Sequence, residues 1–291
     1  MTSGWSGKAL FAVAVWGASF VATRIACASF TPIGLVASRL VVAAIFLALL
    51  ARRERGPFLP ARGDLPACLA LGIVLGAHTL IQTIGLRYTS AISAGWLGAF
   101  TPIPIAIGAG LFLKEKLPAS GRLGVTVAAA GVAVIVMATT PGFTEARTGD
   151  LLQLVSCLTW TIYTLGAMGV IRRNGALRVS GAVTIVAAAV AVPACARGGL
   201  LAAPPTGRSV LAMLFLGLLC SALGHYFWYA ALREQGATRA GAYLYVEPFV
   251  TVILAAPILG EPITLPVIAG GLLALTGVWM VERAKVVDPE S

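Results

Sequence analysis

Residues 86–132 read LRYTSAISAGWLGAFTPIPIAIGAGLFLKEKLPASGRLGVTVAAAGV, and residues 232–278 read LREQGATRAGAYLYVEPFVTVILAAPILGEPITLPVIAGGLLALTGV. At a shift of 146 positions, 14 of these 47 aligned positions are identical. The most specific identities are Arg87 with Arg233, Pro102 with Pro248 and Glu115 with Glu261, and upstream Trp16 aligns with Trp160 at a shift of 144. Apolar composition alone does not place these residue types in register. The sequence therefore predicts a duplicated chain with halves at residues 1–144 and 145–291.

The composition predicts a membrane protein. Hydrophobic residues make up 58 % of the 291 residues and charged residues 11 %, against about 25 % charged in ordinary soluble domains. The lipid bilayer is therefore the expected environment of most of the surface. The net charge of +10 comes from short clusters of cations between apolar runs, which indicates membrane orientation and no nucleic-acid partner.

Ten segments are long and apolar enough to span a membrane as helices. They lie near 8–28, 32–51, 65–86, 91–113, 118–138, 149–171, 177–196, 209–231, 237–259 and 263–283. With a cytoplasmic N-terminus, 15 Lys and Arg residues fall on the inner side and four on the outer side. Cytoplasmic loops are rich in Lys and Arg. We therefore expect both termini in the cytoplasm, and the bacterial inner membrane as the location.

The predicted fold class is an all-α polytopic membrane protein of ten transmembrane helices, arranged as two inverted five-helix repeats. Five spans per half is an odd number, so the second half enters the membrane upside down. Inverted repeats of this kind place a substrate site near the bilayer midplane, where rocking of one half against the other gives alternating access.

Short motifs in both halves resemble those of the EamA family of the drug/metabolite transporter superfamily. WGASF at residues 16–20 resembles the start of the first helix in that family. FLKE at 112–115 and ILGE at 258–261 resemble the ends of its fourth and ninth helices. Pro102 and Pro248 match the proline in the middle of those helices. Lys114 departs from the pattern, because the family usually has Gly before the Glu.

The resemblance implies a ten-helix bundle with cytoplasmic termini that exports small metabolites from a central cavity. It extends over nearly the whole chain, and the aromatic residues of the central spans are most similar to those of aromatic amino acid exporters. Other members carry threonine, homoserine, cysteine metabolites or cationic drugs.

Glu247 is the one carboxylate deep inside a predicted span. A charge there costs at least about 2.5–3.5 kcal/mol on insertion scales, so it should face the bundle interior. It either contacts a substrate amine or a coupling proton, or forms a structural pair with Arg24, Arg39 or a hydroxyl. Arg24 and Arg39 lie toward span ends, where long side chains can reach the membrane surface; capture of a substrate carboxylate is the alternative for both.

Further candidates combine aromatic rings with polar groups on the central spans. His78 and His225 occupy nearly equivalent positions in the two halves, and Gln82 shares a helix face with His78. Rings with a few polar groups suit amphipathic amino acids or cationic drugs; packing between helices is the alternative for each. The predicted substrate-binding residues are His78, Gln82, Trp96, Thr101, Trp160, Tyr163, Tyr243, Tyr245 and Glu247. Pro102 and Pro248 are the predicted hinges, because proline removes a backbone donor; a kink that only shapes the packing is the alternative.

The sequence offers no pattern for chemistry or for a cofactor. Its five cysteines form no C-x-x-C pair and there are two histidines, so neither metal nor cofactor is expected. P-loop, H-E-x-x-H and G-x-S-x-G patterns are absent, so the prediction is no enzyme. We predict an inner-membrane exporter of amino acids, with aromatic or other apolar side chains, and related metabolites. The alternative is a broad exporter of lipophilic cations or drugs. No oligomeric state is predicted.

Overall fold

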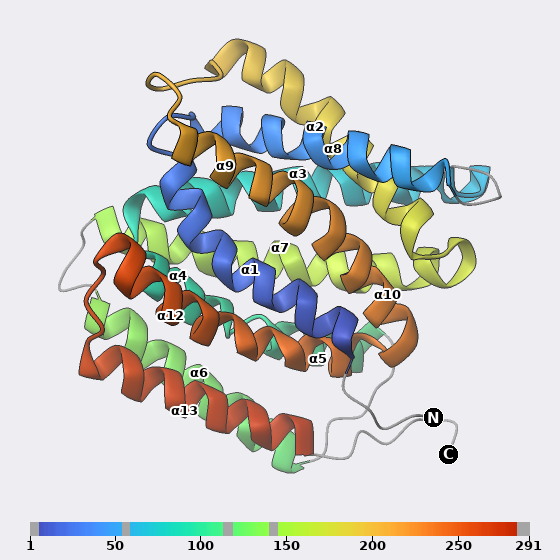
Figure 1. Ribbon diagram of the computed structural model, residues 1–291. Helices are drawn as coiled ribbons and strands as arrows, with labels where there is room; N and C mark the ends of the chain where they lie inside the picture. The colour runs from blue at the N-terminus through green and yellow to red at the C-terminus, as the bar shows by residue number, and fades with distance from the viewer. Residues whose placement is uncertain (1–5, 54–58, 113–118, 140–144, 284–291) are drawn as a thin grey trace.

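The computed structural model describes residues 6–53, 59–112, 119–139 and 145–283. These residues fold into a bundle of helices (Figure 1), and their one β-bridge joins Phe30 to Leu201. In the first half the helices are α1 (Gly7–Ala26), α2 (Pro32–Ala51), the 3₁₀ turn η1 (Arg62–Asp64), α3 (Leu65–Tyr88), α4 (Ala91–Gly98), α5 (Pro102–Phe112) and α6 (Ala119–Thr139).

The second half continues with helices of the same kind. They are α7 (Glu145–Asn174), α8 (Ala176–Gly198), α9 (Gly207–Phe215), η2 (Leu216–Gly224), α10 (His225–Gln235), α11 (Ala237–Ala242), η3 (Tyr243–Val246), α12 (Glu247–Leu259) and α13 (Leu265–Arg283). Within the described ranges, eight helical segments are long and apolar enough to cross a membrane. Two shorter apolar helices, Ala119–Ile135 and Leu265–Gly277, lie in α6 and α13. The fold is that of a multi-pass membrane protein.

Two of the predicted spans are broken at equivalent prolines. Before Pro102 the chain tightens to a 3₁₀ turn, in which Thr101 N donates to Gly98 O over 2.9 Å. Before Pro248 the turn η3 does the same, and Glu247 N donates to Leu244 O. A proline has no N–H to give to the carbonyl four residues back, so the preceding residue bonds that carbonyl instead. The helices expected over 91–113 and 237–259, each with a proline in its middle, are therefore divided into two parts at these prolines.

The span from Gly207 to Gln235 contains a π-helical segment, η2, between α9 and α10. This segment was not predicted from the sequence. Trp16 Nε1 on α1 donates to the carbonyl of Cys220 in η2 over 3.1 Å. π-Helical turns are rare and are found mainly at functional sites, and η2 lies against α1 and α2.

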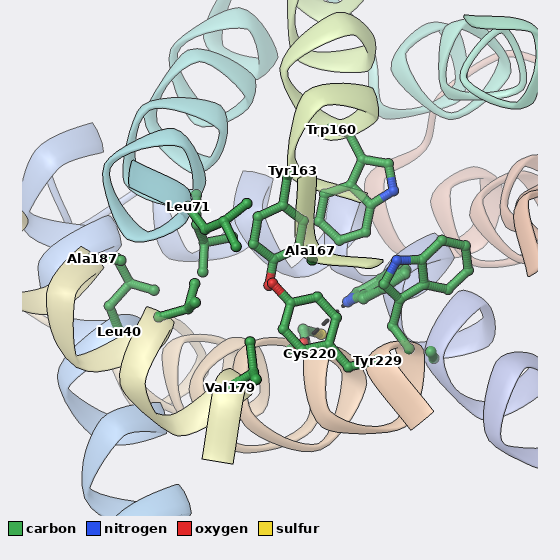
Figure 2. Close-up of a cluster of buried hydrophobic side chains, with 14 of the residues drawn as sticks. Leu40, Leu71, Trp160, Tyr163, Ala167, Val179, Ala187, Cys220 and Tyr229 are labelled. Carbon is green, nitrogen blue, oxygen red and sulfur yellow. Dashed lines mark hydrogen bonds between the residues drawn. The ribbon is translucent and has the colours of Figure 1, made fainter. Parts of the chain in front are cut away.

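Helices from the two halves pack against one another throughout the bundle. α6 packs on α13, α3 on α7 and α2 on α8, while α1 lies against α12 and η2 (Figure 1). α6 and α13 approach so closely that a Cβ on Gly131 would lie 2.3 Å from Ala274 N. The largest buried cluster, part of which is shown in Figure 2, joins α2, α3, α7, α8 and α10 around Tyr163 and Tyr229.

Candidate functional site

A cavity lies where α1, α2, α3, α4, α7, α10 and α12 meet. It contains about 600 Å³ of space between atoms, including the part open to solvent. Its lining carries one acidic side chain, one basic side chain, two imidazoles, two primary amides and several hydroxyls. Such a polar lining inside an apolar bundle is costly unless it serves a ligand or a water-filled path.

Helix α1 contributes aromatic and hydroxyl groups from one of its faces. Trp16, Ser19 and Phe20 line the cavity, and their spacing of three and four residues puts them on one side of the helix. Trp16 is oriented by its bond to the Cys220 carbonyl. Gly17, next in the chain, lets α12 approach, because an added Cβ there would lie 2.6 Å from Glu247 O.

Helices α3 and α7 form a wall of hydrogen-bonding groups. His78 Nδ1 lies 3.0 Å from Ser156 O. A carbonyl oxygen only accepts, so Nδ1 carries the proton and Nε2 is an acceptor. Gln153 Nε2 donates to Gln82 O over 2.9 Å, which fixes the Gln153 amide. All four residues line the cavity.

One acidic and one basic side chain line this cavity. Glu247, at the start of α12, is 7 % exposed. No described residue donates a hydrogen bond to its carboxylate or forms an ion pair with it. Arg39 on α2 is 5 % exposed, and its Nε donates to Ser221 Oγ over 2.8 Å. The described residues contain no ion pair between Arg39 and Glu247, so both charges are available to a ligand.

Tryptophan and histidine rings pack together in the cavity wall. The ring centroids of Trp16 and Trp160 are 4.9 Å apart, those of Trp160 and His78 are 5.1 Å apart, and those of Trp16 and His225 are 5.7 Å apart. Trp160 Nε1 is buried with no partner among the described residues. Figure 2 shows Trp160 beside Tyr163, which is fully buried in the core, and their ring centroids are 5.1 Å apart.

The structure brings five of the predicted substrate-binding residues together. His78, Gln82, Thr101, Trp160 and Glu247 line the cavity. Thr101 and Glu247 are equivalent in the two halves and immediately precede the prolines Pro102 and Pro248. Their contact with a substrate, and the hinge role of the prolines, stay predictions.

The other four predicted residues lie outside the cavity lining. Trp96 packs against Phe249, with ring centroids 5.7 Å apart. Tyr163 stacks on Tyr229 at 5.3 Å. The hydroxyl of Tyr243 accepts from Ser6 N over 2.9 Å, and Tyr245 is buried in a small apolar cluster with Ala99, Ile103 and Ala128. A direct role in substrate binding for these residues also stays a prediction.

Several lining residues were not selected from the sequence. Gln153 and Ser156 lie seven and four residues before the selected Trp160 on the same face of α7. These two polar residues in an apolar span were the available signal. Arg39 was expected to reach the membrane surface but lies in the cavity wall. Arg24 instead donates to Leu86 O at the end of α3, over 2.9 Å.

The ILGE motif at residues 258–261 lies outside the cavity lining, and its Glu261 caps the start of α4. Both carboxylate oxygens of Glu261 accept hydrogen bonds from the first amides of α4, at Ala91 N (2.8 Å) and Ile92 N (2.9 Å). Its counterpart Glu115 lies outside the described residues. Among the residues that the structure describes, no three His, Cys, Asp or Glu side chains form a group that could hold a metal ion.

The fold and the charged cavity define a class of protein: a multi-pass membrane transporter of small molecules. The model of the EamA-like transporter family matches residues 5–137 and again residues 147–283. The chain belongs to this family, which is part of the drug/metabolite transporter superfamily. Its members are transporters and not enzymes.

Relatives over nearly the full length are also transporters. An "Uncharacterized transporter" of Archaeoglobus fulgidus is 26 % identical, over 94 % of this chain and 96 % of its own. A "Probable terminal-alkyne amino-acid exporter" of Streptantibioticus cattleyicolor is 28 % identical, over 93 % and 91 %. A "Probable amino-acid metabolite efflux pump" of Salmonella typhimurium is 25 % identical, over 94 % and 92 %. A protein crystal structure superposes with a TM-score of 0.74 at 19 % identity, over 95 % and 97 % of the two chains.

Proposed function

We propose that this protein exports α-amino acids and related zwitterionic metabolites. The observation that carries the proposal is the presence of Arg39 and Glu247 in one cavity without an ion pair between them. A guanidinium group matches a carboxylate in charge and geometry, and a buried carboxylate matches an ammonium group. An α-amino acid supplies both partners and neutralises both buried charges.

The substrate side chain is proposed to be aromatic or otherwise apolar. Trp16, Phe20 and Trp160 line the same cavity, and aromatic faces bind apolar and ring-bearing groups by stacking and burial. The printed names of two relatives, an amino-acid exporter and an amino-acid metabolite efflux pump, support export of this class of molecule.

The proposed architecture is ten transmembrane helices in two inverted repeats, residues 1–144 and 145–291, with alternating access between the halves. Two observations support it. The family model matches the chain twice. The helix pairs α2 with α8 and α6 with α13 join equivalent spans of the two halves, and the pairing of α1 with η2 has its counterpart in that of α7 with α3. A two-fold relation between the halves produces such pairs.

The proposed location is the bacterial inner membrane with both termini in the cytoplasm. The excess of 15 Lys and Arg residues over four on the opposite side supports this orientation. Efflux of a cytoplasmic metabolite down its concentration gradient then needs only that the cavity opens alternately to the two sides.

Export of lipophilic cations is the competing function. Glu247 has no protein partner and lies in a cavity with Trp16 and Trp160, and a carboxylate with aromatic faces is a suitable cation site. Arg39 in the same cavity opposes this function, because a guanidinium group repels a cation that has no carboxylate.

The test is transport by the purified protein in proteoliposomes. We expect saturable uptake of labelled L-amino acids, inhibited by unlabelled amino acid, and little uptake of the corresponding amines without a carboxylate. Protein-free liposomes are the control. Uptake of tetraphenylphosphonium without uptake of any aromatic, aliphatic or hydroxyl amino acid would overturn the proposal in favour of the competing function.

A further inference from the structure

The π-helical segment η2 contacts Arg39, the arginine that lines the cavity. Ser221 in η2 is fully buried, and its hydroxyl accepts a hydrogen bond from Arg39 Nε at 2.8 Å. η2 reaches α2 because residue 217 is glycine: an added Cβ there would lie 2.8 Å from Val42 Cγ1 and 3.2 Å from Arg39 O. The segment and α2 are therefore in close contact where Ser221 meets Arg39.

The bond to Ser221 determines which donors of Arg39 remain. A guanidinium group has five N–H donors, one on Nε and four on the two terminal nitrogens. Nε is bonded to Ser221, and no other hydrogen bond or ion pair of the Arg39 side chain occurs among the described residues. The terminal nitrogens are the pair that binds a carboxylate with two parallel hydrogen bonds, and Arg39 lines the cavity.

The Arg39–Ser221 contact joins the two halves, and the equivalent pair of residues cannot form it. At the 146-residue shift Ser221 corresponds to Leu75, and at the 144-residue shift Arg39 corresponds to Val183. Both counterparts are apolar and fully buried, and the segment around Leu75 is regular α-helix. If this contact served the alternating-access movement, in which both halves take part, an equivalent contact would be expected at the equivalent residues. The Arg39–Ser221 contact has no counterpart at the equivalent positions. Glu247 also has no acidic counterpart, because the equivalent residue is Thr101.

We infer that Ser221 is a positioning residue for substrate recognition: through its bond to Nε it orients Arg39 so that the two terminal nitrogens face the cavity and bind the substrate carboxylate. The inference rests on the proposed function and assigns the carboxylate subsite within it. It makes Ser221, which is outside the cavity lining, a determinant of selectivity for amino acids over amines.

The test compares L-phenylalanine with 2-phenylethylamine, which differs from it by the missing carboxylate. Uptake of labelled L-phenylalanine into proteoliposomes gives KM and kcat, and competition gives the inhibition constant of 2-phenylethylamine. We expect Ser221→Ala to raise the KM of L-phenylalanine about tenfold, the typical effect of one hydrogen bond to a charged group. The inhibition constant of the amine should change less than about twofold, and kcat should change little, because the cavity itself is unaltered.

Two further variants test whether Ser221→Ala acts through the orientation of Arg39 or through a general defect in folding. Ser221→Thr retains the hydroxyl and should restore the KM. Ser180→Ala removes a buried hydroxyl of α8 that has no partner in the part of the chain that the structure describes, and should leave both constants unchanged. An unchanged KM in Ser221→Ala, or an equal rise for amino acid and amine, would overturn the inference while leaving amino acid export intact. A wild-type protein that transports no amino acid would instead refute the proposed function.

Discussion

Trp16 and Trp160 pack edge to face with ring centroids 4.9 Å apart. They are equivalent positions of the two halves, 144 residues apart in sequence, and each also lies beside a histidine at nearly equivalent positions of the two halves. Trp160 contacts His78 of the first half, and Trp16 contacts His225 of the second. The cavity therefore lies where the two halves meet, which is the expected place for a substrate site in the proposed inverted-repeat transporter.

Trp160 and Trp96 were both predicted to bind substrate, and replacing each of them should have different effects. Trp160 lines the cavity, whereas Trp96 packs against Phe249 and Gly271. Trp160→Phe replaces the indole in the cavity lining with a smaller ring. We therefore expect the KM for a transported amino acid to rise about three- to tenfold, in line with the energy of an aromatic contact. Trp96→Phe should leave KM unchanged. Initial rates of uptake into proteoliposomes give both values, and equal effects in the two variants would contradict the assignment.

Gly98 controls the space beside Glu247. An added Cβ would lie 3.5 Å from Glu247 Oε2 and 3.8 Å from Phe20 Cζ, both ordinary van der Waals distances. Gly98→Ala should therefore fold normally but occupy room that a substrate ammonium group needs, and raise KM roughly tenfold, since small displacements at a binding group are costly. Gly181→Ala on α8 is the matched control, because no heavy atom lies within 4 Å of its added Cβ. Parallel melting curves and uptake assays test this, and a normal KM in Gly98→Ala would count against ligand binding at Glu247.

Much of the fold could be predicted because composition and length constrain helices in lipid. The predicted span 32–51 coincides with α2, Pro32–Ala51, and the span 65–86 lies within α3, Leu65–Tyr88. A hinge or kink at Pro102, between α4 and α5, was predicted, but the form of the break and the π-helical turns of η2 were not. They depend on which backbone carbonyls find alternative donors, such as Trp16 Nε1 for Cys220 O, 204 residues away.

The site was harder to predict than the fold. Hydropathy gives the depth of a residue in the membrane, but in helices that are apolar on every side it does not show which face points inward. Glu247 and His78 could be selected, because a polar side chain at that depth needs an internal place. Tyr163 and Trp96 could not be distinguished from cavity residues, since rings pack equally well between helices. Arg39 was misplaced because its partner Ser221 is 182 positions away in sequence.

Thr251 links α12 to α1, and its hydroxyl should contribute to stability. Its Oγ1 lies 2.8 Å from Gly17 O and 2.9 Å from Glu247 O, and the side chain is fully buried. Thr251→Val retains the shape and loses these bonds, so we expect a loss of about 0.6–1.7 kcal/mol in the free energy of unfolding, the range for interhelical bonds in membranes. Reversible unfolding in detergent measures this.

Thr184→Val is the control for Thr251→Val. Thr184 on α8 is also buried, but its hydroxyl has no partner among the described residues. Replacing an unbonded buried hydroxyl with a methyl group should leave stability unchanged or raise it. If both threonine variants lose the same stability, packing and not hydrogen bonding accounts for the effect.

Glu261 should stabilise the N-terminus of α4. Its carboxylate accepts from Ala91 N and Ile92 N, which are free amide donors at the start of a helix. Glu261→Ala removes both acceptors, and we expect it to lose about 1–2 kcal/mol of stability, the range for a lost helix cap. Glu261→Gln keeps one acceptor oxygen and should lose less. The order of the melting temperatures, wild type above Gln above Ala, is the test; a Gln variant no better than Ala would exclude capping by this side chain.

The charges of Arg39 and Glu247 should have separable effects on two kinds of ligand. Arg39→Gln removes the carboxylate partner, and we expect uptake of amino acids to fall about a hundredfold in kcat/KM, the cost of leaving a buried charge unpaired. Because it also removes the charge that repels cations, tetraphenylphosphonium should bind better to this variant than to wild type. Glu247→Gln removes the partner of the ammonium group and should weaken both ligands. Uptake of a labelled amino acid and displacement of labelled tetraphenylphosphonium distinguish the two variants. Loss of tetraphenylphosphonium binding in Arg39→Gln would show that Arg39 supports the structure of the cavity and does not select for a carboxylate.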